Sequence, residues 1–240
     1  MGPLLQFKGH VMGHLQSQHL SATDETNVAF QRFVGLVEAK SRSFGFVGAT
    51  RRGKCILVGE GNLSFALAIA RHPKGHASNL IATTFEAARA CSPAAIENAK
   101  ALSRLGARVI HGVDARTLTE KHLPARADLV AFQFPNTGTR RSVYNRTDNH
   151  ILVRRFLTAA RARLSANGLI AITIVNSPHH LGAFDLPQAA TWAGCDVLEV
   201  LPFYRSTWSG YGHVNTNDPE QSALRHHRSC STWVFRAAKR

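Results

Sequence analysis

From Lys54 onward, short apolar runs alternate with longer segments whose apolar residues recur at helical spacing. This alternation is typical of α/β proteins, in which helices cover both faces of a mostly parallel sheet. The apolar runs predict seven strands, at residues 54–59, 79–84, 107–111, 127–134, 169–175, 196–203 and 230–236. The helical spacing predicts helices at residues 64–72, 93–105, 147–165 and 183–193. We expect the third helix to end at Asn167–Gly168, because glycine readily adopts the left-handed conformation that stops a helix.

The last two predicted strands are separated by residues 204–229, which contain Ser, Gly, Asn, Pro and His but few apolar positions. No convincing helical pattern occurs there, so we predict that the two strands form an antiparallel pair joined by a long loop. A loop of this length within a compact domain commonly carries function.

The first fifty residues differ in pattern from the rest of the chain. Residues 1–20 are polar and show no clear periodicity, which predicts an arm. After this arm, Ser21 or Thr23 can cap an accessory helix. A basic linker is expected to follow that helix. We therefore divide the chain into an N-terminal arm with an accessory helix (1–50) and an α/β domain (51–240).

Composition narrows the classes of function. The 240 residues are 44% hydrophobic, which is enough to bury a core, and no run of about 18 apolar residues is present to span a membrane. The formal net charge of +14 favours a polyanionic partner, with nucleic acid as the first candidate; arginine-rich genome composition is the alternative explanation. The four cysteines are widely scattered, which predicts buried thiols in a reducing cytoplasm and no metal site.

A glycine-containing turn follows the first predicted strand. The run CILV at residues 55–58 leads directly into GEGNLSF at residues 59–65, after which the pattern becomes helical. Glycines at such a turn let the backbone approach a ligand, and the start of the helix supplies free N–H groups and positive potential. Ser64 stands where a dinucleotide-binding fingerprint has its third glycine, so this turn alone also fits a purely structural role.

The next three predicted strands also end in polar or glycine-containing segments. The second is followed by Glu86, where an acidic residue can meet a ribose diol, and the third by Asp114, which can accept from an adenine amino group. The fourth leads into FPNTG at residues 134–138. Because ligands of open parallel sheets bind at the carboxyl ends of the strands, these features predict a nucleoside-type cofactor. Helix capping by Glu86 and turn formation by Asp114 are the structural alternatives.

Four of these segments resemble the Rossmann-like domain of the large-subunit ribosomal RNA uridine-N3 methyltransferase family. They are ILVGEGNLSFALAIA at 56–70, NLIATTFE at 79–86, RVIHGVDA at 108–115 and DLVAFQFPNTG at 128–138. The resemblance covers roughly residues 54–235. It implies a Rossmann-like class I methyltransferase fold, with a seven-stranded, mostly parallel sheet whose last strand is antiparallel. It also implies S-adenosyl-L-methionine as the cofactor.

The resemblance further implies which residues bind that cofactor. Gly59, Glu60 and Gly61 would line its methionine end, Glu86 would bind its ribose hydroxyls, and Asp114 its adenine. The complete set of implied cofactor-binding residues is Gly59, Glu60, Gly61, Asn62, Ser64, Glu86, Asp114, Ala115 and Phe134. Residues 134–136, with the sequence Phe-Pro-Asn, would occupy the position where many nitrogen methyltransferases place the motif that faces the acceptor base.

The acceptor side needs a group that handles a proton, because uridine N3 carries a hydrogen that must leave during methylation. The candidate catalytic residues are Asp148, His213 and Asn136, and His150 and Tyr211 are weaker candidates for the base. An ordinary loop position is the alternative reading of His213.

Candidate substrate-binding residues surround the end of the fourth strand. Residues 138–165 contain seven Arg against one Asp, and the arginines nearest to that strand are the predicted phosphate contacts. A solvated helix face is the alternative for the later arginines. Aromatic side chains in the same region can stack on a splayed base. The candidate substrate-binding residues are Pro135, Arg140, Arg141, Arg146 and Tyr211.

We therefore predict a cytoplasmic, S-adenosylmethionine-dependent enzyme that methylates uridine N3 in ribosomal RNA and needs neither a metal nor a membrane. Two alternatives remain open. One is a small-heterocycle N-methyltransferase of the same fold, in which a base-shaped pocket serves without a polynucleotide. The other is a non-catalytic RNA-binding factor that retains the fold. The predicted partner is thus RNA or a small heterocyclic substrate.

Overall fold

The computed structural model of the 240-residue chain describes residues 44–139, 142–143, 146–214 and 229–239. The predicted arm and accessory helix therefore lie almost entirely outside the described residues. Within the described part, no helix is long and apolar enough to cross a membrane.

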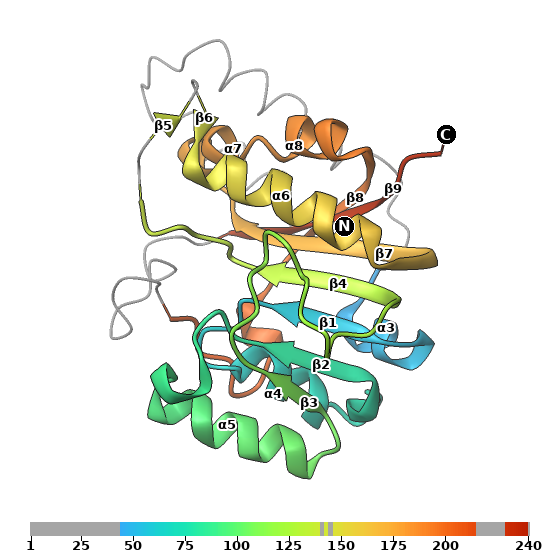
Figure 1. Ribbon diagram of the computed structural model, residues 1–240, viewed down its shortest axis with the longest axis vertical. Coiled ribbons are helices and arrows are strands. Elements are labelled where there is room, and N and C mark those ends of the chain that lie inside the picture. Colours follow the sequence, from blue (N-terminus) through green and yellow to red (C-terminus); the bar gives the residue numbers. More distant parts are fainter. Residues whose placement is uncertain (1–43, 140–141, 144–145, 215–228, 240) are drawn as a thin grey trace, which may run out of the picture.

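A seven-stranded sheet separates two layers of helices (Figure 1). The strands are β1 (Cys55–Val58), β2 (Leu80–Thr83), β3 (Arg108–Ile110), β4 (Ala127–Gln133), β7 (Leu164–Val175), β8 (Cys195–Pro202) and β9 (Cys230–Ala237), and a separate pair comprises β5 (Ser142–Val143) and β6 (Arg146–Thr147). The sheet order is β3-β2-β1-β4-β7-β9-β8. Pairs from β3 to β7 are parallel, whereas β9 is antiparallel to both β7 and β8. The predicted seven-stranded, mostly parallel sheet with an antiparallel last strand is confirmed.

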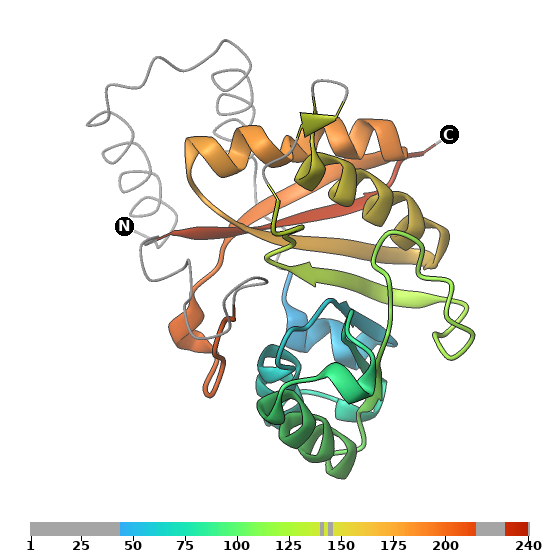
Figure 2. The same cartoon turned by 60° about the vertical axis from the view of Figure 1, so that its left-hand side comes forward.

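Helices cover both faces of this sheet, as the turned view shows (Figure 2). They are α3 (Phe46–Arg52), α4 (Ser64–Arg71), α5 (Pro93–Arg104), α6 (Asp148–Ala162), α7 (Pro178–Phe184) and α8 (Leu186–Ala193), with 3-10 turns at Ala77–Asn79, Ala88–Ala90 and Arg205–Thr207. Successive strand residues point to opposite faces. Ile56 and Val58 join a core with α6, α7 and α8, whereas Cys55 and Leu57 join a second core with α3, α4 and α5. Burial on both faces explains why β1 is apolar throughout.

The third predicted helix ends earlier than expected. α6 stops at Ala162, and Asn167 and Gly168 lie inside β7. A Cβ atom on Gly168 would lie 2.7 Å from the carbonyl oxygen of Ala127, so this glycine permits a close approach of the β4 backbone. The expected helix stop at Asn167–Gly168 was therefore wrong, because the glycine serves strand packing.

Two other sequence predictions also need correction. The helix predicted at 183–193 is the two helices α7 and α8, which are separated by Asp185 in the left-handed conformation (φ 37°). The Asp185 side chain accepts from the backbone N–H of Gln188 and thereby caps α8. The segment before β1 was predicted as a basic linker, but residues 46–52 form α3, which buries Phe46 in the core.

Candidate cofactor and acceptor pocket

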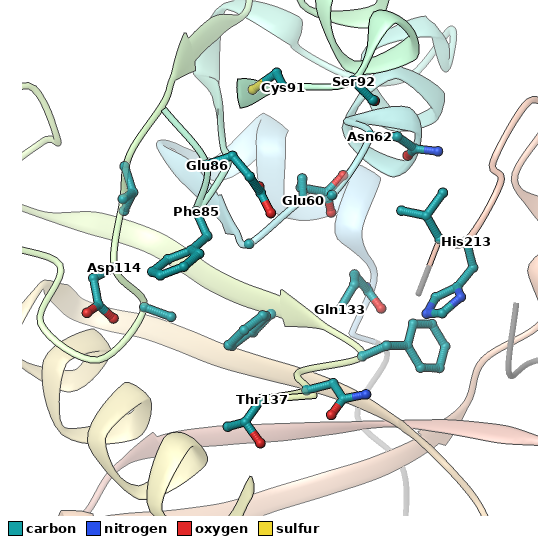
Figure 3. A pocket seen from close by; sticks show the side chains of 18 of the residues that line it. Glu60, Asn62, Phe85, Glu86, Cys91, Ser92, Asp114, Gln133, Thr137 and His213 are labelled. Carbon is teal, nitrogen blue, oxygen red and sulfur yellow. The ribbon is translucent and has the colours of Figure 1, made fainter. Parts of the chain in front are cut away.

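A cavity of about 480 Å³ opens at the carboxyl ends of β1, β2 and β4 and beside the loop that follows β3 (Figure 3). In Figure 3, Asp114 and Glu86 lie toward one end of this pocket and His213 lies toward the other, with Glu60 and Gln133 between them. Following the sequence prediction, we call the end with Glu86 and Asp114 the cofactor end. We call the end with Phe134, Tyr211 and His213 the acceptor end.

The glycine turn after β1 allows close packing at the centre of the pocket. Gly59 has a left-handed backbone (φ 65°), and a Cβ atom there would lie only 2.6 Å from the ring of Phe132. The turn is held against β2 by a hydrogen bond from the Glu60 N–H to the carbonyl oxygen of Thr83. α4 follows at Ser64–Arg71, and each of its ends lies within one residue of the predicted helix at 64–72.

Glu60 places a carboxyl group in the wall of the pocket although the residue is only 5% exposed. Its Oε2 atom accepts a hydrogen bond from the Ala66 backbone N–H, at 3.0 Å, in the first turn of α4. Burial raises the pKa of the Glu60 carboxyl to about 7, and the hydrogen bond from Ala66 opposes this shift. A charge at this buried position is therefore costly, and a cationic ligand in the pocket would favour it.

Glu86 and Phe85 form the wall that follows β2. The Glu86 carbonyl oxygen accepts from the Gly112 N–H and from the Thr84 hydroxyl, which ties the loops after β2 and β3 together. The Glu86 side chain is exposed at the pocket surface, where it can bind a ligand hydroxyl pair. Phe85 also lines the pocket and is 61% exposed, so it offers an apolar surface to a flat ligand group.

Asp114 also lines the pocket, and its carboxylate is engaged by Arg116. The shortest distance between the two, from Asp114 Oδ2 to Arg116 Nη2, is 2.6 Å. This hydrogen-bonded guanidinium holds the pKa of the Asp114 carboxyl below its usual value. A carboxylate offers about four acceptor positions, so Asp114 can still accept from a further donor. Ala115 beside it is buried and contributes to the same wall.

The acceptor end is lined by aromatic rings. Phe134 follows β4 in a left-handed conformation (φ 49°), and its ring centre lies 5.1 Å from that of His213, edge to face. Burial, with the nearby Arg205 cation, lowers the pKa of His213 to about 4, so the imidazole is neutral near pH 7. Tyr211 packs edge to face against Phe65 at 5.3 Å, and burial raises the pKa of its hydroxyl.

A set of hydrogen bonds fastens the acceptor end to the glycine turn. The Gly212 carbonyl oxygen accepts from Asn62 Nδ2 at 2.9 Å and from Ser64 Oγ at 3.0 Å, and the Gly212 N–H donates to Ser64 Oγ. Asn62 lines the pocket, whereas Ser64 is not among the lining residues. The predicted cofactor residue Ser64 therefore contacts the chain itself at Gly212. Val214 approaches Gly61 in the same contact, since a Cβ on Gly61 would lie 2.8 Å from its side chain.

The remaining predicted acceptor residues are divided by the structure. Asn136 lines the pocket, but Pro135 is buried beside it and does not. Asp148 begins α6 and accepts from the Thr139 hydroxyl at 2.6 Å, outside the pocket lining. Arg146 also lies outside the lining, 3.7 Å from Asp185. The predicted phosphate contacts Arg140 and Arg141 lie outside the described residues.

The weaker base candidate His150 is also kept from the pocket. Its Nδ1 lies 2.8 Å from the carbonyl oxygen of Phe184, and the residue is buried between α6 and α7. Burial lowers the pKa of His150. We find no group of three or more His, Cys, Asp or Glu residues arranged to hold a metal ion in the described ranges.

Several residues that line the pocket were not among the predicted site residues. Phe85 and Arg116 follow strands β2 and β3, next to residues that were predicted, and could have been found by extending the strand-end argument. Gln133 is the last residue of β4 and was taken as part of the strand. Cys91 was expected to be buried, but it is half-buried and lines the pocket, whereas the other three cysteines are buried.

These features define the class of protein. The strand order, the antiparallel last strand, the glycine turn after β1 and acidic residues after β2 and β3 together make a Rossmann-like methyltransferase fold with a pocket at the expected sheet edge. Residues 56–215 match the model of the BMT5-like family, which is described as rRNA (uridine-N3-)-methyltransferase BTM5-like. The chain belongs to this family and is a methyltransferase by class.

Similar proteins include two from Arabidopsis thaliana. Uncharacterized protein At4g26485 is 32% identical over 168 residues, covering 66% of this chain and 79% of that protein. Heavy metal-associated isoprenylated plant protein 41 is 28% identical over 199 residues, covering 77% of this chain. The chain spans only 37% of the length of this second relative.

Among solved structures, the O-methyltransferase NcsB1 from neocarzinostatin biosynthesis, in complex with S-adenosylmethionine, matches with a TM-score of 0.48 and 16% identity. The match covers 91% of this chain and 57% of that chain. TrmN from Thermus thermophilus matches with a TM-score of 0.46 and 18% identity, covering 77% of this chain and 44% of that chain.

Proposed function

We propose that this protein uses S-adenosylmethionine to methylate N3 of uridine in ribosomal RNA. One observation carries the proposal: eight of the nine residues expected to bind a methyl donor, all but Ser64, line the same cavity as Asn136, Tyr211 and His213, which are expected on the acceptor side. Glu60, Glu86 and Asp114 belong to one end and centre of this cavity, and Tyr211 and His213 to the other. Membership in the BMT5-like family supports the choice of ribosomal RNA uridine as the substrate.

The chemistry of the pocket residues fits S-adenosylmethionine. The cofactor supplies a methyl group on a positively charged sulfur and also carries an α-ammonium group. The buried Glu60 carboxyl, with its raised pKa, becomes easier to ionise beside such cations. Glu86 offers a carboxylate for the ribose diol, and Asp114 offers acceptor positions for the adenine amino group. Phe85 presents an apolar face near both of them, against which the adenine can lie.

The acceptor end suits a flat, uncharged ring. Phe134, Tyr211 and His213 enclose it, and their edge-to-face contacts with neighbouring rings fix their orientation. His213 is neutral and can accept a hydrogen bond from a ring N–H, whereas a charged imidazolium could not. We assign proton acceptance at uridine N3 to His213 and a supporting polar role to Asn136, since Asp148 is outside the pocket lining.

Charge supports a polynucleotide as the carrier of the acceptor base. The chain has 29 Lys and Arg against 15 Asp and Glu. We propose that Arg140, Arg141 and Arg146, which follow the loop after β4 in the sequence, contact phosphates. Binding to RNA should then weaken at least tenfold between about 50 and about 200 mM salt, because several condensed cations are released on binding. A flat salt response would remove RNA from the proposal.

The experiment that tests the function offers the purified protein methyl-labelled S-adenosylmethionine together with unmodified ribosomal RNA or with a small-molecule extract. Label should appear in N3-methyluridine after digestion of the RNA to nucleosides. Glu86→Gln should lose at least tenfold in cofactor affinity, whereas Glu97→Gln, which alters an exposed acid on α5, should behave as the parent. Label confined to the small-molecule extract, or to another nucleoside, would contradict the proposal.

A further inference from the structure

Gln133 brings an unpaired amide to the wall of the pocket. It is the last residue of β4 and lines the cavity between Glu60 and His213 (Figure 3). Both its Oε1 and its Nε2 atom are shielded from solvent, and neither has a hydrogen-bond partner among the described residues. Buried amides in folded proteins are nearly always paired. An amide left unpaired in a pocket wall therefore indicates a ligand that supplies one acceptor and one donor.

The protein groups around Gln133 are already committed to each other. Its partner in the sheet register is Thr173, whose hydroxyl lies 2.8 Å from that of Thr232. The Thr173 carbonyl oxygen accepts from the Phe134 N–H, and Glu60 Oε2 accepts from Ala66. The backbone of Gln133 is thus held by the sheet, while its amide keeps its bonding capacity and can reach a bound molecule by a rotation of the side chain.

Resting on the proposed function, we propose that the Gln133 amide bridges the two substrates. Its Oε1 accepts from the α-ammonium of S-adenosylmethionine, and its Nε2 donates to one of the two uracil carbonyl oxygens that flank N3. This arrangement uses both unpaired atoms and follows from the place of Gln133 between the glycine turn, where the methionine part is expected, and the acceptor end. Gln133 is then a specificity-determining residue that requires a carbonyl beside the nucleophilic nitrogen.

The chemical benefit lies in the acidity of the acceptor nitrogen. When N3 gives up its proton to His213, the negative charge spreads over N3 and the two ring carbonyl oxygens. An N–H donor at one of these oxygens stabilises that anion, and a water-excluded site strengthens the effect. The N3 electron pair then forms the new bond to the methyl carbon as the carbon–sulfur bond breaks and its electron pair stays on sulfur. The donor from Gln133 allows a weak base to suffice.

The cofactor half of the proposal is tested by calorimetry, without any RNA. Gln133→Leu should bind S-adenosylmethionine about tenfold more weakly, which corresponds to the loss of one charge-assisted hydrogen bond. The same variant should bind 5′-methylthioadenosine, which lacks the ammonium, as well as the parent does. Gln133→Glu should bind S-adenosylmethionine at least as tightly as the parent. Equal losses for both ligands in Gln133→Leu would overturn this half.

The acceptor half is tested by the rate of methylation at saturating cofactor. Gln133→Glu removes the donor and should slow transfer to uridine-containing RNA by about a hundredfold. RNA made with 5-fluorouridine has a more acidic N3, so the loss on this RNA should be about tenfold smaller. A purely structural defect would lower both rates equally, and that result would overturn the acceptor half.

Two controls separate this inference from the proposed function. Gln188→Leu makes the same side-chain change on α8, away from the pocket lining, and should leave both assays unchanged. If the parent protein methylates no uridine, the proposed function fails and the acceptor half fails with it, while the comparison with methylthioadenosine still decides the cofactor half. Methylation at an atom with no neighbouring carbonyl would contradict the proposed function together with the acceptor half, and the comparison with methylthioadenosine would still decide the cofactor half.

Discussion

At the cofactor end of the pocket each acidic side chain follows its own strand within a few residues, whereas the acceptor end is assembled from distant parts of the chain. Glu86 and Asp114 come directly after β2 and β3. Tyr211 and His213 reach the pocket from the segment after β8, and Gly212 is fastened to Ser64, which lies 148 positions earlier. The two ends should therefore respond to different kinds of change, because local backbone geometry controls the cofactor end and long-range attachment controls the acceptor end.

The largest effect should come from the glycine turn that supports the cofactor end. Gly59→Ala adds a Cβ at a left-handed position, where it meets the Phe132 ring at 2.6 Å. We expect cofactor affinity to fall by at least about a hundredfold in calorimetry, because the strain and the clash both displace the turn. Gly106→Ala is the matched control, since its φ is also positive (86°) but nothing lies within 4 Å. This control should cost about 1 kcal/mol of stability and leave binding unchanged. Equal binding losses in the two variants would contradict the prediction.

The attachment of the acceptor end should give the next largest effect. Ser64→Ala removes both hydrogen bonds between the serine hydroxyl and Gly212, while Asn62 retains its own. We expect methyl transfer to fall about tenfold and the free energy of unfolding to fall by about 1 to 2 kcal/mol. Cofactor affinity should change by less than about threefold. Ser103→Ala, which removes a hydroxyl on the exposed side of α5, is the control. Loss of cofactor affinity comparable to the loss of transfer would show that the two ends are not separable.

The pH dependence should distinguish the centre of the pocket from both ends. The pKa of Glu60 is raised from an ordinary value near 4.5 to about 7, so the folded protein holds this proton more tightly than the unfolded chain does. Its contribution to stability is therefore complete below about pH 4.5 and is lost as the pH rises through about 7. Cofactor affinity should move in the opposite direction and increase as Glu60 ionises.

Chemical denaturation measures the trend in stability, and calorimetry measures the trend in cofactor affinity, both between about pH 5 and about pH 8. The upper limit lies about one unit above the raised pKa of Glu60. Glu60→Gln cannot titrate, so the contribution of this group to both trends should disappear in that variant. The variant should also bind the cofactor more weakly near pH 8, where the parent carboxylate is charged. Identical pH profiles for parent and variant would assign the titration to another group.

The smallest effect should come from Arg116, which forms an ion pair with Asp114, the residue predicted to bind the adenine of the cofactor. Arg116→Ala removes a cation that competes for this carboxylate and repels a positively charged cofactor. We expect cofactor affinity to rise about two- to fivefold at low salt, and the pKa of Asp114 to return toward its usual value. Lys100→Ala breaks an exposed ion pair on α5 and should leave affinity unchanged. A weaker affinity in Arg116→Ala would mean that this side chain itself holds the cofactor.

The sequence predicted the parts of the site that depend on strand ends. Seven apolar runs, a glycine turn and acidic residues after successive strands were enough to place Gly59, Glu86 and Asp114 at one sheet edge, because parallel strands all end on the same side. The same reasoning located the antiparallel terminal pair from the missing helix between β8 and β9. Their cofactor roles remain proposals, but their common location follows from topology.

The sequence was least informative where a residue type has more than one use. Gly168 was wrongly predicted as a helix stop, because it lies in β7 against the Ala127 carbonyl oxygen. The cofactor role of Ser64 stays a prediction, and the structure adds a contact of its hydroxyl with Gly212. In both cases the contact partner, Ala127 for Gly168 and Gly212 for Ser64, lies far away in the sequence. The spacing of residues along the chain does not show which distant segment folding brings into contact.

The sheet, its edge and the residues that follow its strands could therefore be predicted from the sequence, since periodicity and strand direction are local properties with a single spatial outcome. The side chains that can still bond to a ligand depend on contacts that arise only on folding. Arg116 uses part of the bonding capacity of Asp114, the hydroxyl of Ser64, which is not in the pocket lining, bonds to Gly212, and the Gln133 amide is left unpaired. Hydrogen bonds satisfied across long separations in the chain determine this availability, because each donor and acceptor can be used by whichever partner folding brings near.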